Sequence, residues 1–262
     1  GRMTEAQAMF RSAVALDQDS RRPASLGVLM PQTWRMVAAN DARLGRRAAA
    51  KAALEASERA HQEQVAMLPE GSARRELMLR AMPVWQARLQ LLLGDFTPAL
   101  DLSNEVLVRL REVEVAEDDR FAKLTRDNVS RFALATSALA ALRLGRYAEA
   151  EAETRERLAL PPTLNADADP QDEKSRATVL LAHAIAAQGR RAEALELLVP
   201  VLDGYRAEQK AGASGTTFQR DLAYALFVEA IAQPTDAAAR TRRNAALAAA
   251  QREFDALSDE AR

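Results

Sequence analysis

The stretch Leu144-Gly145-Arg146-Tyr147-Ala148-Glu149-Ala150 decides the fold class, because a single glycine there separates two long alanine-rich segments. Glycine readily adopts the left-handed backbone conformation that ends a helix and reverses the chain. The same arrangement recurs at Gly45, Gly94 and Gly189, and these glycines are 44 to 51 residues apart. A period of that length predicts a chain built from stacked helix pairs.

Small residues stand at fixed distances from these glycines. An alanine lies five residues after each anchor, counted from Gly1, the four glycines above and Gln233; these are Ala6, Ala50, Ala99, Ala150, Ala194 and Ala238. Another lies seven residues before each internal glycine, at Ala38, Ala87, Ala138 and Ala182. We expect these alanines to be buried where the two helices of a pair cross, because small side chains let the helix axes approach closely.

The composition favours helices throughout. Alanine, the best helix former, supplies 57 of the 262 residues, whereas Trp, Tyr and Phe together supply 5%. Turn-rich segments divide the chain into about eleven predicted helices, near residues 3–16, 28–44, 47–67, 73–93, 97–114, 120–144, 147–160, 172–188, 191–210, 217–232 and 236–257. Pro83 is expected to shift or kink its helix, and Pro200 to bend or divide its own. The sequence therefore predicts an all-α protein.

The hinge and its alanines resemble the tetratricopeptide repeat, in which a small residue, a Gly-x-Tyr turn and an early alanine mark each helix pair. The stretch at Gly145 matches best, followed by Gly94-Asp95-Phe96 with Ala99, and Trp34 stands where the family often has Trp. The spacing exceeds the 34 residues of the family, and arginines replace two of the turn aromatics, at Arg47 and Arg191. The repeats are therefore expected to be long-helix variants.

The resemblance implies a right-handed α-α superhelix of about five helix pairs, preceded by an N-terminal half repeat and forming one domain over residues 1–262. Because the chain opens within a repeat, we expect it to be a fragment of a longer protein. The helix at 3–16 has an apolar face without a preceding partner. We expect that face to dock on the next pair or to be covered by a second copy of the chain in a homodimer.

The resemblance also implies a concave groove lined by the first helix of every pair. In that register the groove includes the polar and aromatic residues Gln32, Arg35, Arg43, Arg88, Phe132, Arg143, Arg176 and His183, with the apolar residues Val84 and Val179 between them. Guanidinium groups among apolar side chains suit a protein or peptide partner that carries acidic side chains. A scaffold for protein-protein interaction is therefore expected. The alternative is a sensory or regulatory region of a bacterial signalling protein, such as a kinase or a transcription regulator.

Sequence motifs for catalysis, metals and nucleotides are missing. The chain has no cysteine and no phosphate-binding loop, and its two histidines, His61 and His183, lack the spacing of a zinc site. The alternation Asn165, Asp167, Asp169 resembles the start of a calcium loop but lacks its later ligands, which favours an acidic linker. We therefore expect no enzyme activity, no cofactor and no metal. The charged segment around Glu151 is interpreted as an exposed helix face.

Charge and hydropathy restrict which partners and which cellular compartment are expected. The 36 basic and 37 acidic residues nearly cancel, so nucleic acid is not an expected partner. The longest uncharged apolar stretches, at 132–142 and 177–189, are too short to span a membrane, and no signal peptide opens the chain. These features predict a cytoplasmic protein without membrane contact. The heavy use of alanine and arginine is typical of bacteria with GC-rich genomes.

Overall fold

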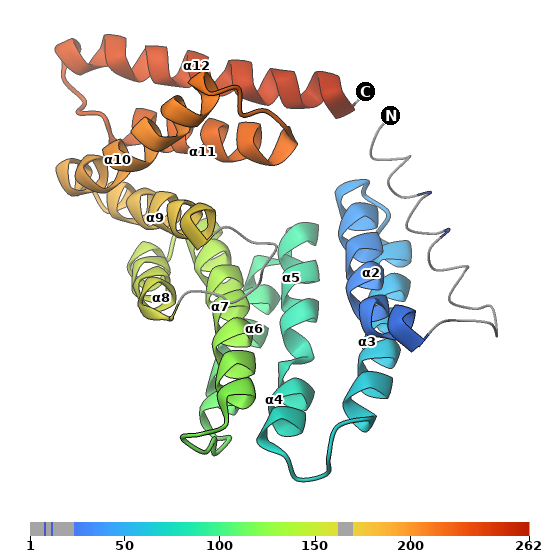
Figure 1. The fold of residues 1–262 in the computed structure, drawn as a ribbon. Coiled ribbons are helices and arrows are strands. Elements are labelled where there is room, and N and C mark those ends of the chain that lie inside the picture. Colours follow the sequence, from blue (N-terminus) through green and yellow to red (C-terminus); the bar gives the residue numbers. More distant parts are fainter. Residues whose placement is uncertain (1–7, 9–11, 13–23, 162–169, 262) are drawn as a thin grey trace. The chain divides into compact units, whose positions relative to one another are not determined.

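The structure, a computed structural model, describes residues 8, 12, 24–161 and 170–261 (Figure 1). All regular elements in these ranges are helices, which confirms the predicted all-α class. They are α2 (Ala24–Arg43), α3 (Arg47–Ala66), α4 (Ala73–Ala81), α5 (Pro83–Leu93), α6 (Phe96–Arg111), α7 (Arg120–Arg143), α8 (Tyr147–Ala159), α9 (Pro170–Ala187), α10 (Arg191–Lys210), α11 (Thr216–Ala232) and α12 (Ala237–Ala261). The predicted half repeat over 3–16 and the acidic linker at 165–169 lie outside the described residues, apart from positions 8 and 12.

Two prolines within predicted helices affect those helices differently. The helix predicted over 73–93 is divided into α4 and α5, because Pro83 lacks an amide hydrogen and takes the first position of a new helix. Pro200 was expected to bend or divide its helix, but α10 runs undivided from Arg191 to Lys210. Pro200 and Glu196, whose carbonyl loses its helical partner, are both exposed, so water can satisfy that carbonyl.

Four glycine hinges share one geometry. Gly45, Gly94, Gly145 and Gly189 have φ angles of 72°, 84°, 76° and 86°, so the predicted left-handed conformation is confirmed. At the first hinge the Gly45 amide donates to the Ala42 carbonyl at 3.0 Å, and the Arg46 amide donates to the Asp41 carbonyl at 2.8 Å. This pair of bonds is the Schellman closure of a helix. Arg46 also occupies the N-cap position of α3, although its side chain makes no capping bond, so the next helix begins directly after the glycine.

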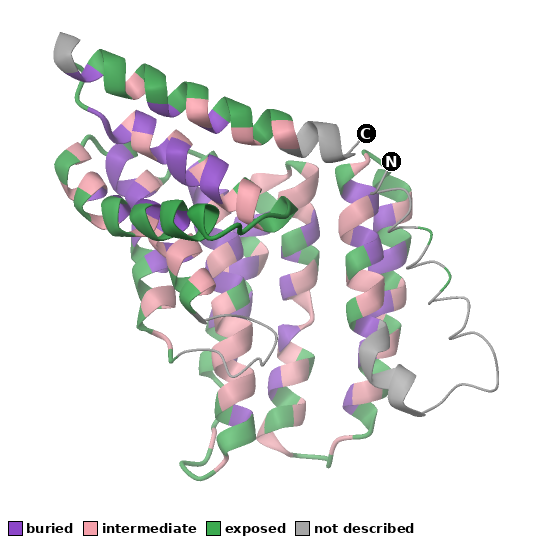
Figure 2. Ribbon diagram, turned by 45° about the horizontal axis from the view of Figure 1, so that its top comes forward, coloured by how far each residue is buried: buried purple, intermediate pink, exposed green. Residues whose placement is uncertain are grey.

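The alanines placed by the repeat are buried. Ala50, Ala99, Ala150 and Ala194, the residues five positions after the hinges, are 0% exposed. Their counterparts seven positions before the hinges are buried as well: Ala38, Ala87, Ala138 and Ala182. The predicted burial is thus confirmed at these eight positions, whereas Ala6 and the side chain of Ala238 lie outside the described set. Buried and exposed residues alternate along the helices, as expected for helices with one core-facing side (Figure 2).

The helices form two compact units, one ending at Leu144 and one beginning at Gly145. In the N-terminal unit, α2 packs on α3 and α5, and α5 packs on α6 and α7. In the C-terminal unit, α9 packs on α8, α10 and α11, and α11 packs on α12. Each unit therefore arranges its helices in serial order, with neighbouring pairs in contact. The superhelix and the single domain over 1–262 stay predictions.

Each unit has its own apolar core. The N-terminal core between α2, α3 and α5 contains Val37 and Leu89, with Trp34 and Trp85 packed against it. The C-terminal core between α9, α10, α11 and α12 contains Ile185 and Leu198, among other buried residues. Along the described residues, no helix combines the length and the apolar character needed to cross a membrane.

Candidate functional site

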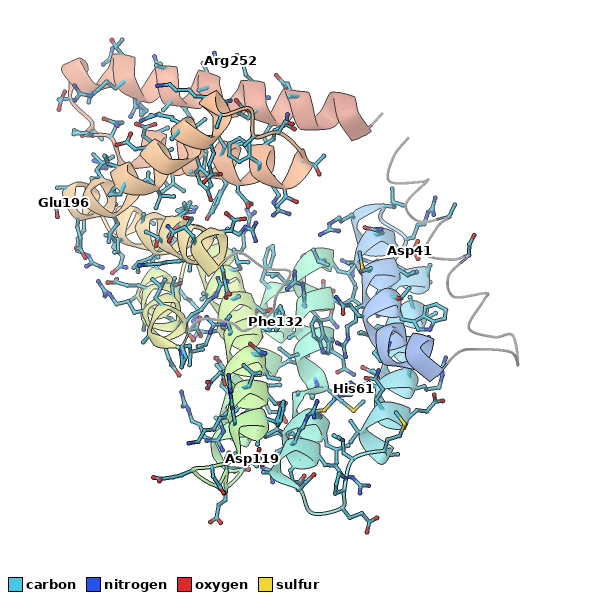
Figure 3. All side chains as sticks on the ribbon, in the orientation of Figure 1. Asp41, His61, Asp119, Phe132, Glu196 and Arg252 are labelled. Carbon is cyan, nitrogen blue, oxygen red and sulfur yellow. The ribbon has the colours of Figure 1, made fainter. Side chains whose placement is uncertain are left out.

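Arg35, Trp85, Arg88 and Phe132 form a continuous group in the N-terminal unit, which we call the Arg-aromatic cluster. The Arg35 guanidinium carbon lies 3.9 Å from the centre of the Trp85 ring. The Trp85 and Phe132 ring centres are 5.3 Å apart at a tilt of 50°, and the Arg88 guanidinium carbon lies 5.9 Å from the Phe132 centre. Figure 3 labels Phe132 on α7. The structure thus brings together three of the residues predicted for the groove.

The cluster is continuous because the first helices of neighbouring helix pairs pack against one another. It draws on α2, α5 and α7, and α5 is in contact with both of the others. Trp85 is half-buried and packs against the core, which fixes its ring, whereas Phe132 is 41% exposed and Arg88 is exposed. The cluster therefore presents an apolar ring and a guanidinium group to solvent from a rigid base.

A buried histidine contacts Arg35 of the cluster. His61 on α3 is 7% exposed; its Nε2 lies 3.1 Å from the Met78 carbonyl and its Nδ1 lies 3.4 Å from Nη2 of Arg35. These contacts fit a neutral ring that donates through Nε2 and accepts through Nδ1. Burial lowers the pKa of His61, the Met78 bond raises it and Arg35 lowers it further; the net direction is downward. Burial also lowers the pKa of Arg35 to about 10, so Arg35 keeps its charge at neutral pH.

The remaining predicted groove residues of this unit lie apart from the cluster contacts. Gln32 and Arg43 are exposed on α2, where Arg43 donates to Asn40 at 3.2 Å, and Arg143 is exposed at the end of α7. The prediction that Val84 lines the groove was wrong, because Val84 is 2% exposed and faces the core. The next residue, Trp85, is half-buried and belongs to the Arg-aromatic cluster. The sequence offered one indication that was missed, an aromatic residue in a first helix three positions before a predicted groove arginine.

Arg176 lies in the C-terminal unit beside an open pocket. Its Nε donates to Oδ2 of Asp221 at 2.5 Å, and its Nη2 lies 3.8 Å from Oδ2 of Asp172. Burial lowers the pKa of Arg176. The hydrogen bond and charge of Asp221 and the charge of Asp172 raise it by more, so the net direction is upward. Val179 was also predicted for the groove, and this was wrong, because Val179 is 1% exposed.

His183 belongs to an aromatic group between α9 and α11. Its Nδ1 lies 2.7 Å from the Tyr224 hydroxyl, and its ring centre lies 5.8 Å from those of both Tyr224 and Phe227. The hydroxyl can donate to Nδ1 of a neutral imidazole. The structure therefore gives the two predicted groove residues of this unit, Arg176 and His183, different partners.

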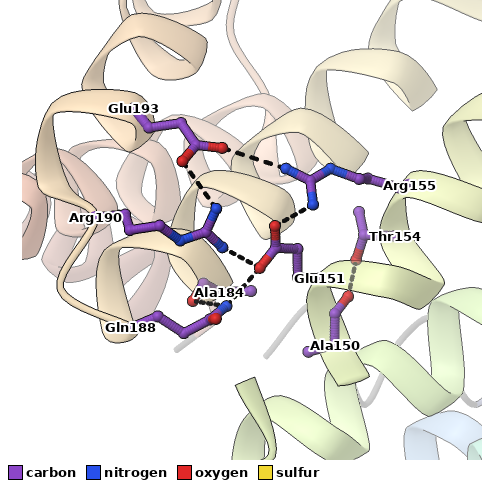
Figure 4. Close-up of polar contacts among 8 residues, drawn as sticks. All are labelled: Ala150, Glu151, Thr154, Arg155, Ala184, Gln188, Arg190 and Glu193. Carbon is purple, nitrogen blue, oxygen red and sulfur yellow. Dashed lines mark hydrogen bonds and ion pairs between the residues drawn. The ribbon is translucent and has the colours of Figure 1, made fainter. Parts of the chain in front are cut away.

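The charged segment of α8 is partly buried, contrary to the exposed face predicted from its sequence. Glu151 is 6% exposed, accepts a hydrogen bond from Nε2 of Gln188 at 2.6 Å and pairs closely with Arg155 and Arg190 (Figure 4). Burial alone would raise the pKa of Glu151, but the bonds from Gln188 and Arg190 and the nearby charges hold it below its usual value. This carboxylate therefore ties α8 to the hinge at Gly189.

These arrangements supply recognition chemistry. Cations, aromatic faces and fixed hydrogen-bond donors can bind a partner without any covalent step. Within the described ranges, no group of three or more His, Asp or Glu side chains is placed to hold a metal ion. Comparison of the chain with protein-family models, with curated proteins and with solved structures finds no match.

Proposed function

We propose that the chain is a scaffold for protein-protein interaction, and that its N-terminal unit binds an acidic, partly apolar peptide segment of a partner. The observation that carries the proposal is the Arg-aromatic cluster, which runs without interruption across three helices and ends in an exposed guanidinium and a half-exposed phenyl ring. Arginine and large aromatic residues are the side chains most enriched where binding energy concentrates.

The energetics favour a peptide with both apolar and acidic side chains. Covering the exposed part of Phe132 would contribute roughly 1 kcal/mol from apolar burial. A carboxylate of the peptide would gain a charge-assisted hydrogen bond from Arg88. Because the Phe132 ring already packs against Trp85, little freedom of that side chain is lost on binding.

The serial packing of first helices supports the wider form of the proposal. In each unit the first helices touch one another, α2 to α5 to α7 in one and α9 to α11 in the other. A right-handed superhelix of tetratricopeptide type would continue this layer as the wall of a groove. The long-helix repeat and the groove are parts of the same proposal.

Selection from a random peptide library on the full chain tests the proposal. We expect the selected peptides to be enriched in Asp and Glu beside apolar residues and to change the tryptophan fluorescence, because Trp85 touches Phe132. The double variant Arg88→Ala with Phe132→Ala should weaken binding of a selected peptide by about tenfold or more. Selected peptides without acidic enrichment would contradict the proposal.

A matched variant separates the cluster from general surface effects. Val108→Ala with Arg111→Ala also removes one exposed apolar side chain and one exposed arginine, but from the second helix α6. We expect this variant to keep the affinity of the unaltered chain. An equal loss in both double variants would show that the Arg-aromatic cluster is not the binding surface.

A further inference from the structure

The C-terminal unit contains an open pocket of about 410 Å³ where α9, α10 and the start of α11 meet. Its lining combines charged, hydroxyl and aromatic groups from these three helices and from the turn before α11: Asp172, Arg176, Tyr205, Glu208, Ser214, Gly215, Thr216, Thr217, Phe218 and Asp221. A volume of this size suits a small molecule.

Tyr205 gives the pocket a hydroxyl donor on a largely buried side chain. The residue is 5% exposed, and its ring packs edge-on against Phe218 with centres 5.9 Å apart. No described residue forms a hydrogen bond with its hydroxyl, which is nevertheless not sealed from solvent. Burial first, and then the charge of Asp221, raises the pKa of Tyr205 to about 12, so the hydroxyl keeps its proton. Because it is accessible and has no partner among the described residues, this hydroxyl can donate to a polar solute in the pocket.

The start of α11 adds backbone donors. Gly215 occupies the N-cap position and has no side chain that could cap the helix. The first helical bond runs from the Gln219 amide to the Gly215 carbonyl at 3.0 Å, so the amides of Thr216, Thr217 and Phe218 have no acceptor within the helix. Such amides, together with the helix dipole, favour a carboxylate at this end of the pocket.

Acidic side chains dominate the other charges of the lining. Asp172, Glu208 and Asp221 are carboxylates and Arg176 is the one guanidinium among the lining residues, so the lining carries a net charge of about -2. Arg176 is already paired with Asp221 and Asp172. A purely anionic ligand would therefore be repelled, whereas a ligand with an ammonium group would be attracted to Asp172 and Glu208.

We propose that this pocket binds a small zwitterion of the α-amino acid class. The ligand carboxylate would accept from the Thr216 and Thr217 amides and from the Tyr205 hydroxyl, and the ligand ammonium would face Asp172 and Glu208. The site lies within the C-terminal unit, and the inference is independent of peptide binding by the N-terminal unit. A small-molecule site is also what the regulatory alternative would need.

Titration of the isotope-labelled full chain with the free amino acids, followed by amide NMR, tests the proposal. We expect at least one amino acid to shift the amides of residues 205 and 216–218. A diamine such as putrescine and a dicarboxylate such as glutarate should bind more weakly, because each lacks one of the two groups. The absence of amino-acid binding, or tighter binding of the diamine or the dicarboxylate, would overturn the proposal.

Substitutions locate the site. Tyr205→Phe removes only a hydroxyl that has no hydrogen-bond partner among the described residues, so the variant should fold normally and bind the amino acid about tenfold more weakly. Asp172→Asn should weaken binding to a similar degree. Tyr147→Phe makes the same chemical change on α8, away from the pocket lining, and should leave binding unchanged. Unchanged affinity in both Tyr205→Phe and Asp172→Asn would assign the binding elsewhere and overturn the inference.

Discussion

The N-terminal and C-terminal units use the same hinge but differ in the chemistry of their candidate binding sites. The φ angles of Gly45 and Gly189 differ by only 14°, from 72° to 86°, and the alanines that follow them are equally buried. In the N-terminal unit Phe132 remains 41% exposed beside arginines, whereas in the C-terminal unit Tyr205 is buried beside a pocket of paired charges. The residues that specify the fold are thus separate from those that specify recognition.

The aromatic residues make this comparison measurable. Both tryptophans, Trp34 and Trp85, belong to the N-terminal unit, and the three tyrosines belong to the C-terminal unit. Tryptophan fluorescence therefore follows one unit alone. Hydrogen exchange resolved by peptide follows each unit separately.

The largest effect is expected from filling a helix crossing. Ala50→Leu in α3 and Ala194→Leu in α10 should each destabilise their own unit by about 1–3 kcal/mol, because the added side chain has no space at a fully buried crossing. The first should lower the urea midpoint followed by tryptophan fluorescence, and the second should lower exchange protection in the C-terminal unit.

Neighbouring exposed alanines provide the matched changes. Ala48→Leu and Ala192→Leu add the same side chain two residues earlier in the same helices. They should change stability by less than about 0.5 kcal/mol. Similar losses in the buried and exposed variants would contradict the tight crossings on which the shared scaffold depends.

A smaller effect should distinguish the ion pairs of the two units. Glu151→Gln should destabilise the C-terminal unit by about 1–2 kcal/mol, because the carboxylate is buried and accepts charged hydrogen bonds. Asp95→Asn breaks the pair with Arg47 at 3.0 Å in the N-terminal unit, but both side chains are partly exposed, so the loss should stay below about 1 kcal/mol. Denaturant unfolding of both variants measures the difference, and a larger loss in Asp95→Asn would reverse the assignment.

The smallest effect is a difference in pH dependence. The folded-state pKa of His61 is lowered, so the unfolded chain binds the extra proton and the N-terminal unit loses stability as the pH falls below about 6.5. The pKa of Glu151 is also lowered, so its contribution is present above its ordinary pKa of 4.5 and is lost only as the pH falls below it. Between pH 7.5 and 5.5 the N-terminal unit should therefore lose up to about 1 kcal/mol.

Tryptophan-monitored urea unfolding at several pH values checks this prediction. His61→Gln keeps a polar side chain without a titrating ring, so the loss between pH 7.5 and 5.5 should disappear in that variant. A loss of the same size in His61→Gln would assign the pH dependence to other groups.

Sequence periodicity predicted the helices and their hinges because both depend on local interactions. Gly145 ends a helix through its own backbone freedom, and Ala150 is buried at a distance from the glycine that helical geometry fixes. Side-chain partners were harder to predict. The sequence placed Val84 in the groove, although Val84 is buried and the next residue, Trp85, is not. It also treated Glu151 as exposed. Neither error could be detected from the helical pattern, because that pattern is the same in both cases.

By itself, the sequence determined that the described chain is helical, where most of its helices begin and end to within a few residues, and which hinge-related alanines are buried, since these depend on contacts within a few turns of one helix. Only the tertiary structure decided that Arg35, Trp85 and Phe132 form one stack and that Tyr205 lies beside Arg176 and Asp221. Residues far apart in the chain meet through the rotation of one helix against the next. A change of one residue in register turns a side chain by about 100°, which exchanges a core position for a surface one.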